Sequence, residues 1–263
     1  MISFFTTIFF ILGIIIGSFL NVVIYRFHTR KVLGGRSACM SCQNKLHFYE
    51  LIPLISFFVL RGRCRVCKTK ISKMYPIVEF ITGLIFLGLF LKFQDILFLN
   101  LPVFIFTYVY YAIVLSLLIV IAFYDLRHKI IPDALSIAFG LLSFLGLFFF
   151  NEYGFSIHIP TVLQFFSGFI IALPFALFWL VSKGTWMGLG DAKLAIGLGY
   201  LIGLARALSG MVIAFWSGAI LGILLVLFSK KYGMKSEIPF APFLIFGTVV
   251  AFFFELYIFP TIF

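Results

Sequence analysis

Long apolar runs, separated by short polar stretches, dominate the pattern of residues along this chain. Each run approaches the length that a membrane-spanning helix needs, roughly 20 residues. The pattern predicts helices at 2–25, 75–93, 102–124, 134–150, 161–181, 208–228 and 239–259, with a shorter, Gly-rich eighth helix at 191–205. We therefore expect an all-α polytopic membrane protein with about eight transmembrane helices.

Composition supports a membrane location. The chain is 63% hydrophobic and only 11% charged, and its mean hydropathy is +1.18. A soluble domain of this size has no interior large enough to bury so much apolar surface. The first run lacks a basic segment before it and a cleavage-site pattern after it, so we interpret it as an uncleaved anchor with its N-terminus outside.

The basic residues indicate the orientation. If the helices alternate across the membrane, the segments 26–74, 125–133, 182–190 and 229–238 share one side. With their immediate flanks they hold eighteen of the twenty Lys and Arg residues, and the positive-inside rule makes that side cytoplasmic. Topology and contact with membrane lipid head groups account for the net charge of +11, so nucleic acid is not an expected partner.

The segment 26–74 is the only sizeable piece outside the predicted helices, and it carries all four cysteines. They form two C-x-x-C pairs, Cys39 with Cys42 and Cys64 with Cys67, separated by 21 residues. Two such pairs supply the tetrahedral sulfur set that Zn²⁺ prefers, with no open position for catalysis, which predicts a structural metal. Free or redox-active cysteines are the alternative, because the reducing cytoplasm disfavours disulfides.

Two aspartates lie where predicted helices end or begin. Asp125 ends a 23-residue apolar run, and Asp191 opens the run at 191–205, so both fall at the cytoplasmic ends of their helices. An acid deep in a membrane costs about 2.5–3.5 kcal/mol and usually serves a function. Two carboxylates at one depth can share a proton and activate water. Helix capping, or pairing with Arg127 and Lys193, explains them equally well on residue chemistry alone.

Nearby residues carry further expectations. Gly188 and Gly190 before Asp191 can permit a tight turn and the close approach of another chain, such as an extended peptide. Asp133, which follows Pro132, is predicted to be the N-cap of the helix at 134–150.

Several motifs occur in an order and spacing typical of one family. The chain resembles the prepilin peptidases, or type IV leader peptidases, which contain a G-x-G-D motif of intramembrane aspartyl proteases. The resemblance implies that Asp125 and Asp191 are the catalytic aspartates. The stretches that carry it are "GSFLNVVIYR" (17–26), both C-x-x-C pairs, "LIPLISF" (51–57), "YPIVE" (75–79), "DLRHKIIPD" (125–133) and "MGLGDAKL" (187–194).

The resemblance also implies two activities. Members with the large cysteine loop cleave the short basic leader of prepilins or pseudopilins after Gly, at the cytoplasmic face of the bacterial inner membrane. They then N-methylate the new terminal residue with S-adenosylmethionine. The implied division is an anchor at 1–25, a methyltransferase-associated loop at 26–74 and a peptidase bundle at 75–263. One departure is visible, because Met40 and Ser41 stand where the family commonly has Pro.

The sequence indicates the methyl-donor residues only weakly. No Gly-rich nucleotide-binding loop of a Rossmann unit occurs, so membrane helices and the cysteine loop must build any such site. Asn21 shares a helical face with Gly17 and Tyr25, and Glu79 is expected at a similar depth in the membrane. Asn21 and Glu79 are the candidates for the methyl-donor site, because helix packing and topology do not explain them.

Other function classes stay open at this stage. A proton- or cation-coupled transporter is the alternative from another class, since intramembrane acids also mark ion paths. We would expect its acids near the midplane of the membrane rather than at one face. A catalytically silent scaffold is a third reading, and the sequence does not indicate an oligomeric state.

Overall fold

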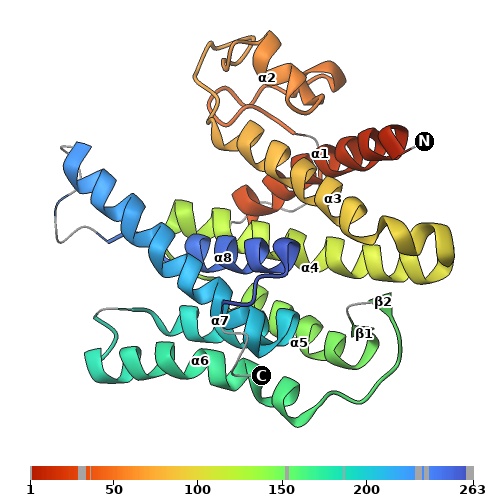
Figure 1. The fold of residues 1–263 in the computed structure, drawn as a ribbon. Coiled ribbons are helices and arrows are strands. Elements are labelled where there is room, and N and C mark those ends of the chain that lie inside the picture. Colours follow the sequence, from red (N-terminus) through yellow and green to blue (C-terminus); the bar gives the residue numbers. More distant parts are fainter. Residues whose placement is uncertain are drawn as a thin grey trace. The chain divides into compact units, whose positions relative to one another are not determined.

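The computed structural model describes residues 2–28, 34–35, 37–151, 154–185, 187–228, 233 and 237–258 (Figure 1). By its internal contacts the chain divides into two compact units, Met1–Lys92 and Phe93–Phe263. The three-part division expected from the sequence rests on chemistry and stays a prediction. The elements are α1 (Ile2–Arg26), the 3₁₀ helix η1 (Phe48–Leu51), α2 (Ile55–Val59), α3 (Met74–Leu99), α4 (Leu101–His128), α5 (Asp133–Phe149), β1 (Phe150–Asn151), β2 (Gly154–Phe155), α6 (Val162–Ser182), α7 (Leu189–Phe228) and α8 (Ala241–Phe254).

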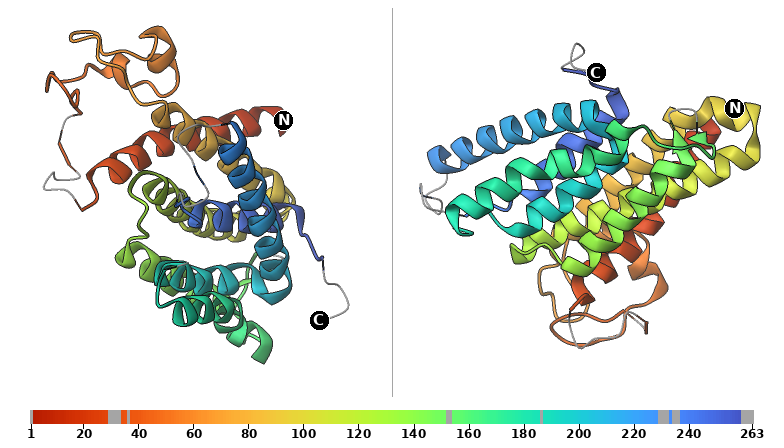
Figure 2. Two further views of the ribbon diagram at one scale, coloured as in Figure 1. Left: turned by 90° about the vertical axis from the view of Figure 1, so that its left-hand side faces the viewer. Right: turned by 90° about the horizontal axis from the view of Figure 1, so that it is seen from below.

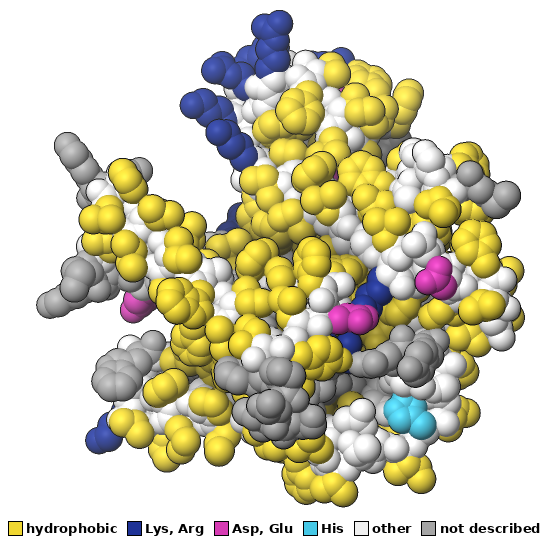
Figure 3. All heavy atoms as spheres, viewed as in Figure 1, with side chains coloured by type: hydrophobic (Ala, Val, Ile, Leu, Met, Phe, Trp, Pro, Cys, Tyr) yellow, Lys and Arg dark blue, Asp and Glu magenta, His cyan; other side chains and the backbone are white. Residues whose placement is uncertain are grey.

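The predicted membrane helices are present. Five helices, α1, α3, α4, α6 and α7, are long and apolar enough to cross a membrane, and α5 and α8 are shorter apolar helices. The two predicted helices at 191–205 and 208–228 correspond to two helical stretches of α7, which meet at a kink where the backbone of Gly203 is not helical. Large apolar side chains cover much of the visible surface in Figure 3, as lipid contact requires. The prediction of an all-α polytopic membrane protein is confirmed.

In the first unit, α1 and α3 pack closely along small residues. A Cβ on Gly13 would lie 2.7 Å from the carbonyl oxygen of Thr82 and 2.8 Å from the Cα of Gly83, so the two backbones nearly touch. Further along, the rings of Phe9 and Phe90 stack with centroids 4.8 Å apart. This close crossing fixes the part of α1 that carries Asn21 against the beginning of α3.

The cysteine-containing segment joins these two helices with little regular structure. Its described residues form only η1, α2 and two isolated bridges, Ala38 with Lys45 and Arg63 with Lys70. The largest group of Lys and Arg side chains in the view of Figure 3 lies over this segment. Short elements of this kind need an additional constraint to hold one conformation, and the paired cysteines can supply it.

In the second unit, α7 packs against α5, α6 and α8, and Figure 2 shows α6 running beside α7. Gly168 on α6 and Gly199 on α7 make a close crossing, because a Cβ on Gly199 would lie 2.7 Å from the Cα of Gly168. At the same place the Ser167 hydroxyl donates a hydrogen bond of 2.9 Å to the carbonyl oxygen of Gly199. Small residues thus set the helix spacing here, as they commonly do in membranes.

A short antiparallel hairpin, β1 with β2, follows α5 and was not predicted. Strands of two residues carry no periodic pattern that a sequence can show. The backbone N–H of Phe155 donates to the Thr107 hydroxyl at 2.8 Å, which ties the hairpin to α4.

Candidate functional site

Asp125 and Asp191 lie together within the second unit. Asp125 is in the last turn of α4 and Asp191 in the first turn of α7. Both side chains are buried, with 4% and 8% of their surface exposed, and they are close enough for their charges to interact. The connection between α4 and α5 meets the start of α7 nearby, where a Cβ on Gly190 would lie 3.1 Å from the Cβ of Ile131.

Helix ends lie around this pair. Asp191 occupies the first turn of α7, where free backbone N–H groups and the helix dipole favour negative charge. The Asp125 carboxylate faces the backbone N–H of Ala241, the first residue of α8. Asp191 Oδ1 is buried and accepts no hydrogen bond from the residues that the structure describes. The pair therefore offers acceptor atoms to a water molecule or a peptide.

Lys193, one of the two basic residues expected as alternative partners, pairs with a different aspartate. Lys193 Nζ lies 2.7 Å from Asp133 Oδ1, with both side chains partly exposed, so Lys193 is engaged by Asp133. The prediction that Asp133 is an N-cap is wrong, because α5 begins at Asp133 itself and Pro132 occupies the capping position. Asp133 thus joins the start of α5 to the start of α7, beside the aspartate pair.

The two glycines before Asp191 matter because they lack a side chain, not because their backbone conformation is unusual. Neither has a φ angle in the left-handed region, but the expected turn is present, because the N–H of Asp191 donates to the carbonyl oxygen of Gly188 at 3.3 Å. Gly190 allows the close approach to Ile131. At Gly188 a Cβ would meet no described atom nearer than 3.9 Å, and Asp191 Oδ2 would be 4.0 Å away. Gly188 therefore leaves room beside the carboxylate.

The four cysteines come together in the first unit. Their sulfur atoms all lie within 4.8 Å of one another and can hold a metal ion. Cys39 Sγ and Cys67 Sγ are 3.7 Å apart, which matches the edge of about 3.8 Å in a tetrahedron with metal–sulfur bonds of roughly 2.3 Å. These two sulfurs come from different C-x-x-C pairs, so one ion would join both.

Both C-x-x-C pairs have the same local fold. The N–H of Cys39 donates to the carbonyl of Asn44, and the N–H of Cys64 donates to the carbonyl of Thr69, at 3.0 and 2.9 Å. The hydrogen bond between Cys67 and the Thr69 hydroxyl lowers the pKa of the Cys67 thiol to about 6. A lowered pKa favours the thiolate, which is the form that binds metal.

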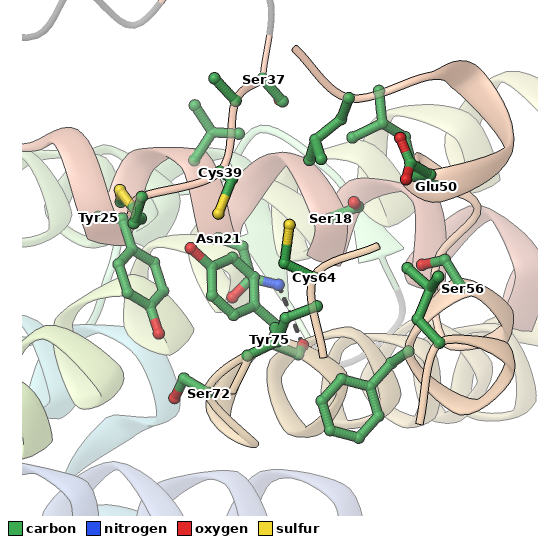
Figure 4. A pocket seen from close by; sticks show the side chains of 18 of the residues that line it. Ser18, Asn21, Tyr25, Ser37, Cys39, Glu50, Ser56, Cys64, Ser72 and Tyr75 are labelled. Atoms are coloured by element: carbon green, nitrogen blue, oxygen red, sulfur yellow. Dashed lines mark hydrogen bonds between the residues drawn. The ribbon is translucent and has the colours of Figure 1, made fainter. Parts of the chain in front are cut away.

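A cavity of about 600 Å³ lies beside this cluster, wholly within the first unit. Cys39, Cys64 and Asn21 line it (Figure 4). So does Glu79, the other residue suggested for the methyl donor. Asn21 Nδ2 donates a 3.0 Å hydrogen bond to the carbonyl oxygen of Tyr75. Asn21 Oδ1 is buried and has no partner among the described residues.

Glu79 holds the backbone of the cysteine segment. Its Oε2 accepts a 2.8 Å hydrogen bond from the N–H of Leu54. Leu54 has φ 60° and ψ −55°, and the N–H of Ile55 donates to the carbonyl of Pro53 at 2.6 Å. This is a γ-turn of the rare, strained form with positive φ, which persists only when its surroundings hold it. Glu79 is one of the groups that do so.

Sequence reasoning missed several of these neighbours. Ser18, which hydrogen-bonds Glu79, precedes Asn21 by three positions, so the helical face that selected Asn21 was a signal for it. The strained turn at Leu54 and the Ala241 amide facing Asp125 had no such signal, because each depends on a contact between distant parts of the chain.

The fold and site together define a multi-pass helical membrane protein with a buried aspartate pair and a separate four-cysteine cluster. Residues 11–93 match the family described as Bacterial Peptidase A24 N-terminal domain, and residues 112–227 match the Type IV leader peptidase family. The chain belongs to the type IV leader peptidase family.

Curated relatives agree with this assignment. Proteins named "Prepilin leader peptidase/N-methyltransferase" are similar to the chain in Myxococcus xanthus (33% identical, covering 89% of this chain and 67% of that protein) and in Pseudomonas aeruginosa (31%, covering 89% and 85%). Another of that name in Bacillus subtilis is 29% identical and covers 94% and 93%. No solved structure matches the chain.

Proposed function

We propose that this chain is a bifunctional membrane enzyme, which cleaves the leader of type IV prepilins or pseudopilins after Gly and then N-methylates the new terminal residue. Membership of the leader peptidase family supports this function, as do relatives named for both activities. The observation that carries the protease assignment is the buried pair of Asp125 and Asp191 at adjoining helix ends.

In this proposal Asp125 and Asp191 act as one acid–base unit. One carboxylate takes a proton from water as the water oxygen attacks the scissile carbonyl. The other, protonated, donates a hydrogen bond to that carbonyl, and a proton then goes to the leaving amine as the C–N bond breaks. Because two interacting carboxylates titrate as a pair, the roles belong to the pair rather than to either residue.

The second activity is assigned to the first unit. S-adenosylmethionine, when bound, supplies a methyl group, which leaves its sulfonium sulfur and bonds to the new amine as the amine loses a proton. Asn21 and Glu79 are proposed to contact this donor, and both line the cavity beside the cysteines. Zn²⁺ is the proposed ion of the cysteine cluster, since four cysteine sulfurs within 4.8 Å of one another suit its tetrahedral coordination and leave no open catalytic position.

The enzyme is proposed to act at the cytoplasmic face of the bacterial inner membrane. The support is the distribution of Lys and Arg residues, most of which lie on one side if the helices alternate. The basic leader of the prepilin would then be cleaved at that face.

The transporter alternative finds no support. Asp125 and Asp191 lie in the last turn of α4 and the first turn of α7, at helix ends rather than in mid-helix. The family and the relatives are named for peptidase and methyltransferase activities.

The test is cleavage of a purified prepilin by the full-length chain in detergent, followed by mass spectrometry. We expect Asp125→Asn and Asp191→Asn each to abolish cleavage, and the double variant to be no worse than either, because the two residues act as a unit. The variants must be present at wild-type levels with wild-type thermal unfolding. An Asp191→Asn enzyme with near-wild-type turnover would overturn the mechanism.

A further inference from the structure

We propose that the cavity of the first unit is the binding site for the adenosyl methyl donor, and that donor binding requires an ion in the four-cysteine cluster. This inference rests on the proposed methyltransferase function, and it deepens that function by assigning a site and a dependence. It stands on an unpartnered buried acceptor, on the ring and carboxylate groups around it, and on the two cysteines that line the cavity.

Asn21 supplies the acceptor. Only 2% of its surface is exposed, and its Nδ2 is fixed by the hydrogen bond to the carbonyl of Tyr75, drawn as the dashed line in Figure 4. That bond sets the direction of Oδ1, which is buried without a partner among the described residues, and Asn21 lines the cavity. Leaving such an acceptor unpaired is costly. A ligand with an N–H donor removes the cost, and an adenine or amino-acid group provides one.

The neighbouring groups suit the rest of the donor. The rings of Tyr25 and Tyr75 are stacked at the cavity wall, with centroids 4.4 Å apart and 9° between their planes. Flat aromatic surface of this kind favours a purine ring and a sulfonium cation. Glu79 adds a buried carboxylate to the lining, which favours positive charge, whereas the buried carboxylate of Glu50 is paired with Arg65 at 3.1 Å. The cavity volume of about 600 Å³ falls within the usual range for small-molecule sites, roughly 300–1,000 Å³.

The cysteine cluster forms part of the same wall. Cys39 and Cys64 line the cavity and come from different C-x-x-C pairs. The segments that follow them also line it, through residues such as Leu46 and Thr69. An ion bound by all four sulfurs would hold these two segments together. Without the ion, these two segments would be less well ordered, and so would the wall of the cavity that they form.

Binding of S-adenosylmethionine and S-adenosylhomocysteine to the metal-loaded, full-length protein, measured by isothermal titration calorimetry, tests the acceptor. We expect Asn21→Leu to weaken binding of both about tenfold, as the loss of one buried hydrogen bond predicts. The matched control is Thr82→Val, which removes a buried hydroxyl from the same α1–α3 contact outside the cavity. Its affinity should stay within about twofold of wild type.

The Asn21 variant must match wild type in metal content and thermal unfolding. A photoreactive donor analogue gives a second readout: with the wild-type protein it should label peptides from 18–26 or 72–79. Wild-type donor affinity in Asn21→Leu, or labelling confined to 93–263, would overturn the proposed site. If the wild-type protein still transfers methyl in that case, the methyltransferase function stands. A wild-type protein that cleaves prepilin but neither binds the donor nor transfers methyl would instead overturn the methyltransferase function itself.

Metal removal tests the dependence. Protein stripped with a chelator should lose at least tenfold in donor affinity and regain it when Zn²⁺ is restored. Stripped protein that binds the donor with wild-type affinity would show that the cluster does not support the site.

Discussion

Three aspartates in the second unit differ in role because their immediate neighbours differ. Asp133 is exposed and meets a lysine ammonium at 2.7 Å, whereas Asp125 and Asp191 are buried beside helix N-termini and each other. All three lie near predicted helix ends, so the sequence shows that they are unusual. It does not show which of them pairs with Lys193. That choice depends on the crossing of α5 and α7, which only the folded chain reveals.

Asp133→Asn should have a small effect. It removes the ion pair with Lys193, and an exposed pair of this kind contributes about 0–1 kcal/mol. We expect thermal unfolding close to wild type and prepilin cleavage within about threefold. Lys193→Gln should behave alike, and the double variant should add little to either. Loss of cleavage in Asp133→Asn without unfolding would mean that Asp133 belongs to the catalytic group.

Glu79 can be tested for its charge and its hydrogen bond separately. Glu79→Gln keeps an oxygen that can accept from the N–H of Leu54 but removes the negative charge, whereas Glu79→Ala removes both. We expect weaker donor binding and less methylated pilin in both variants, and faster proteolysis of the cysteine segment only in Glu79→Ala, because the strained turn loses its acceptor.

Limited proteolysis and mass spectrometry of a co-expressed pilin measure these two effects. Equal methylation by wild type and Glu79→Gln would remove the charge of Glu79 from the donor site. Equal proteolysis of wild type and Glu79→Ala would show that other contacts suffice to hold the turn.

At the scale of elements, α7 shows what a hydropathy pattern resolves and what it does not. The pattern predicts both apolar stretches within α7 but separates them around Arg206, the polar residue between them. The structure instead interrupts the helix at Gly203, where φ is 75° and ψ is 167°. Polarity marks where a chain is exposed, whereas a helix breaks where a residue can adopt a non-helical backbone.

Gly203→Ala should destabilise the second unit. This backbone conformation is essentially restricted to glycine, so a side chain there costs on the order of 1–3 kcal/mol. Space is not the reason, because no described atom lies within 4 Å of a Cβ at Gly203. Gly222→Ala is the matched control within α7, since its Cβ would lie 3.8 Å from Ile238 in ordinary contact and Ala favours a helix.

Thermal unfolding in detergent measures both glycine variants. We expect a clear decrease in the midpoint for Gly203→Ala, and an unchanged or raised midpoint for Gly222→Ala. A Gly203→Ala protein as stable as wild type would mean that α7 can straighten at this position without loss of packing.

At the scale of the whole chain, the sequence predicts the chemistry of the candidate sites in more detail than their three-dimensional architecture. Paired C-x-x-C spacing predicts a common site for four cysteines, and their sulfurs lie within 4.8 Å of one another. A donor site built by membrane helices and the cysteine segment was predicted, with Asn21 and Glu79, but most of the cavity lining was not, because α1, α3 and the cysteine segment each contribute only part of it. The matched families, at 11–93 and 112–227, fall largely in different compact units, which suggests that the two activities have separate structural bases.

That separation leads to a prediction about the metal. Purified protein should contain about one Zn per chain, as expected for a four-thiolate site. Cys42→Ser and Cys67→Ser should each lower the content, because each removes one ligand of the cluster. Ser41→Ala is the matched control, since it changes a side chain inside a C-x-x-C pair without removing a sulfur. Elemental analysis by mass spectrometry gives the metal content.

Activity of the same samples decides what the metal does. Because the cysteines belong to the first unit and Asp125 and Asp191 to the second, metal loss should reduce methylation at least as much as leader cleavage. Mass spectrometry of the pilin product reports both activities in one measurement. A folded chain that contains no metal yet cleaves and methylates at wild-type rates would contradict the structural role of the cluster, and cleavage lost before methylation would contradict the assignment of the two activities to different units.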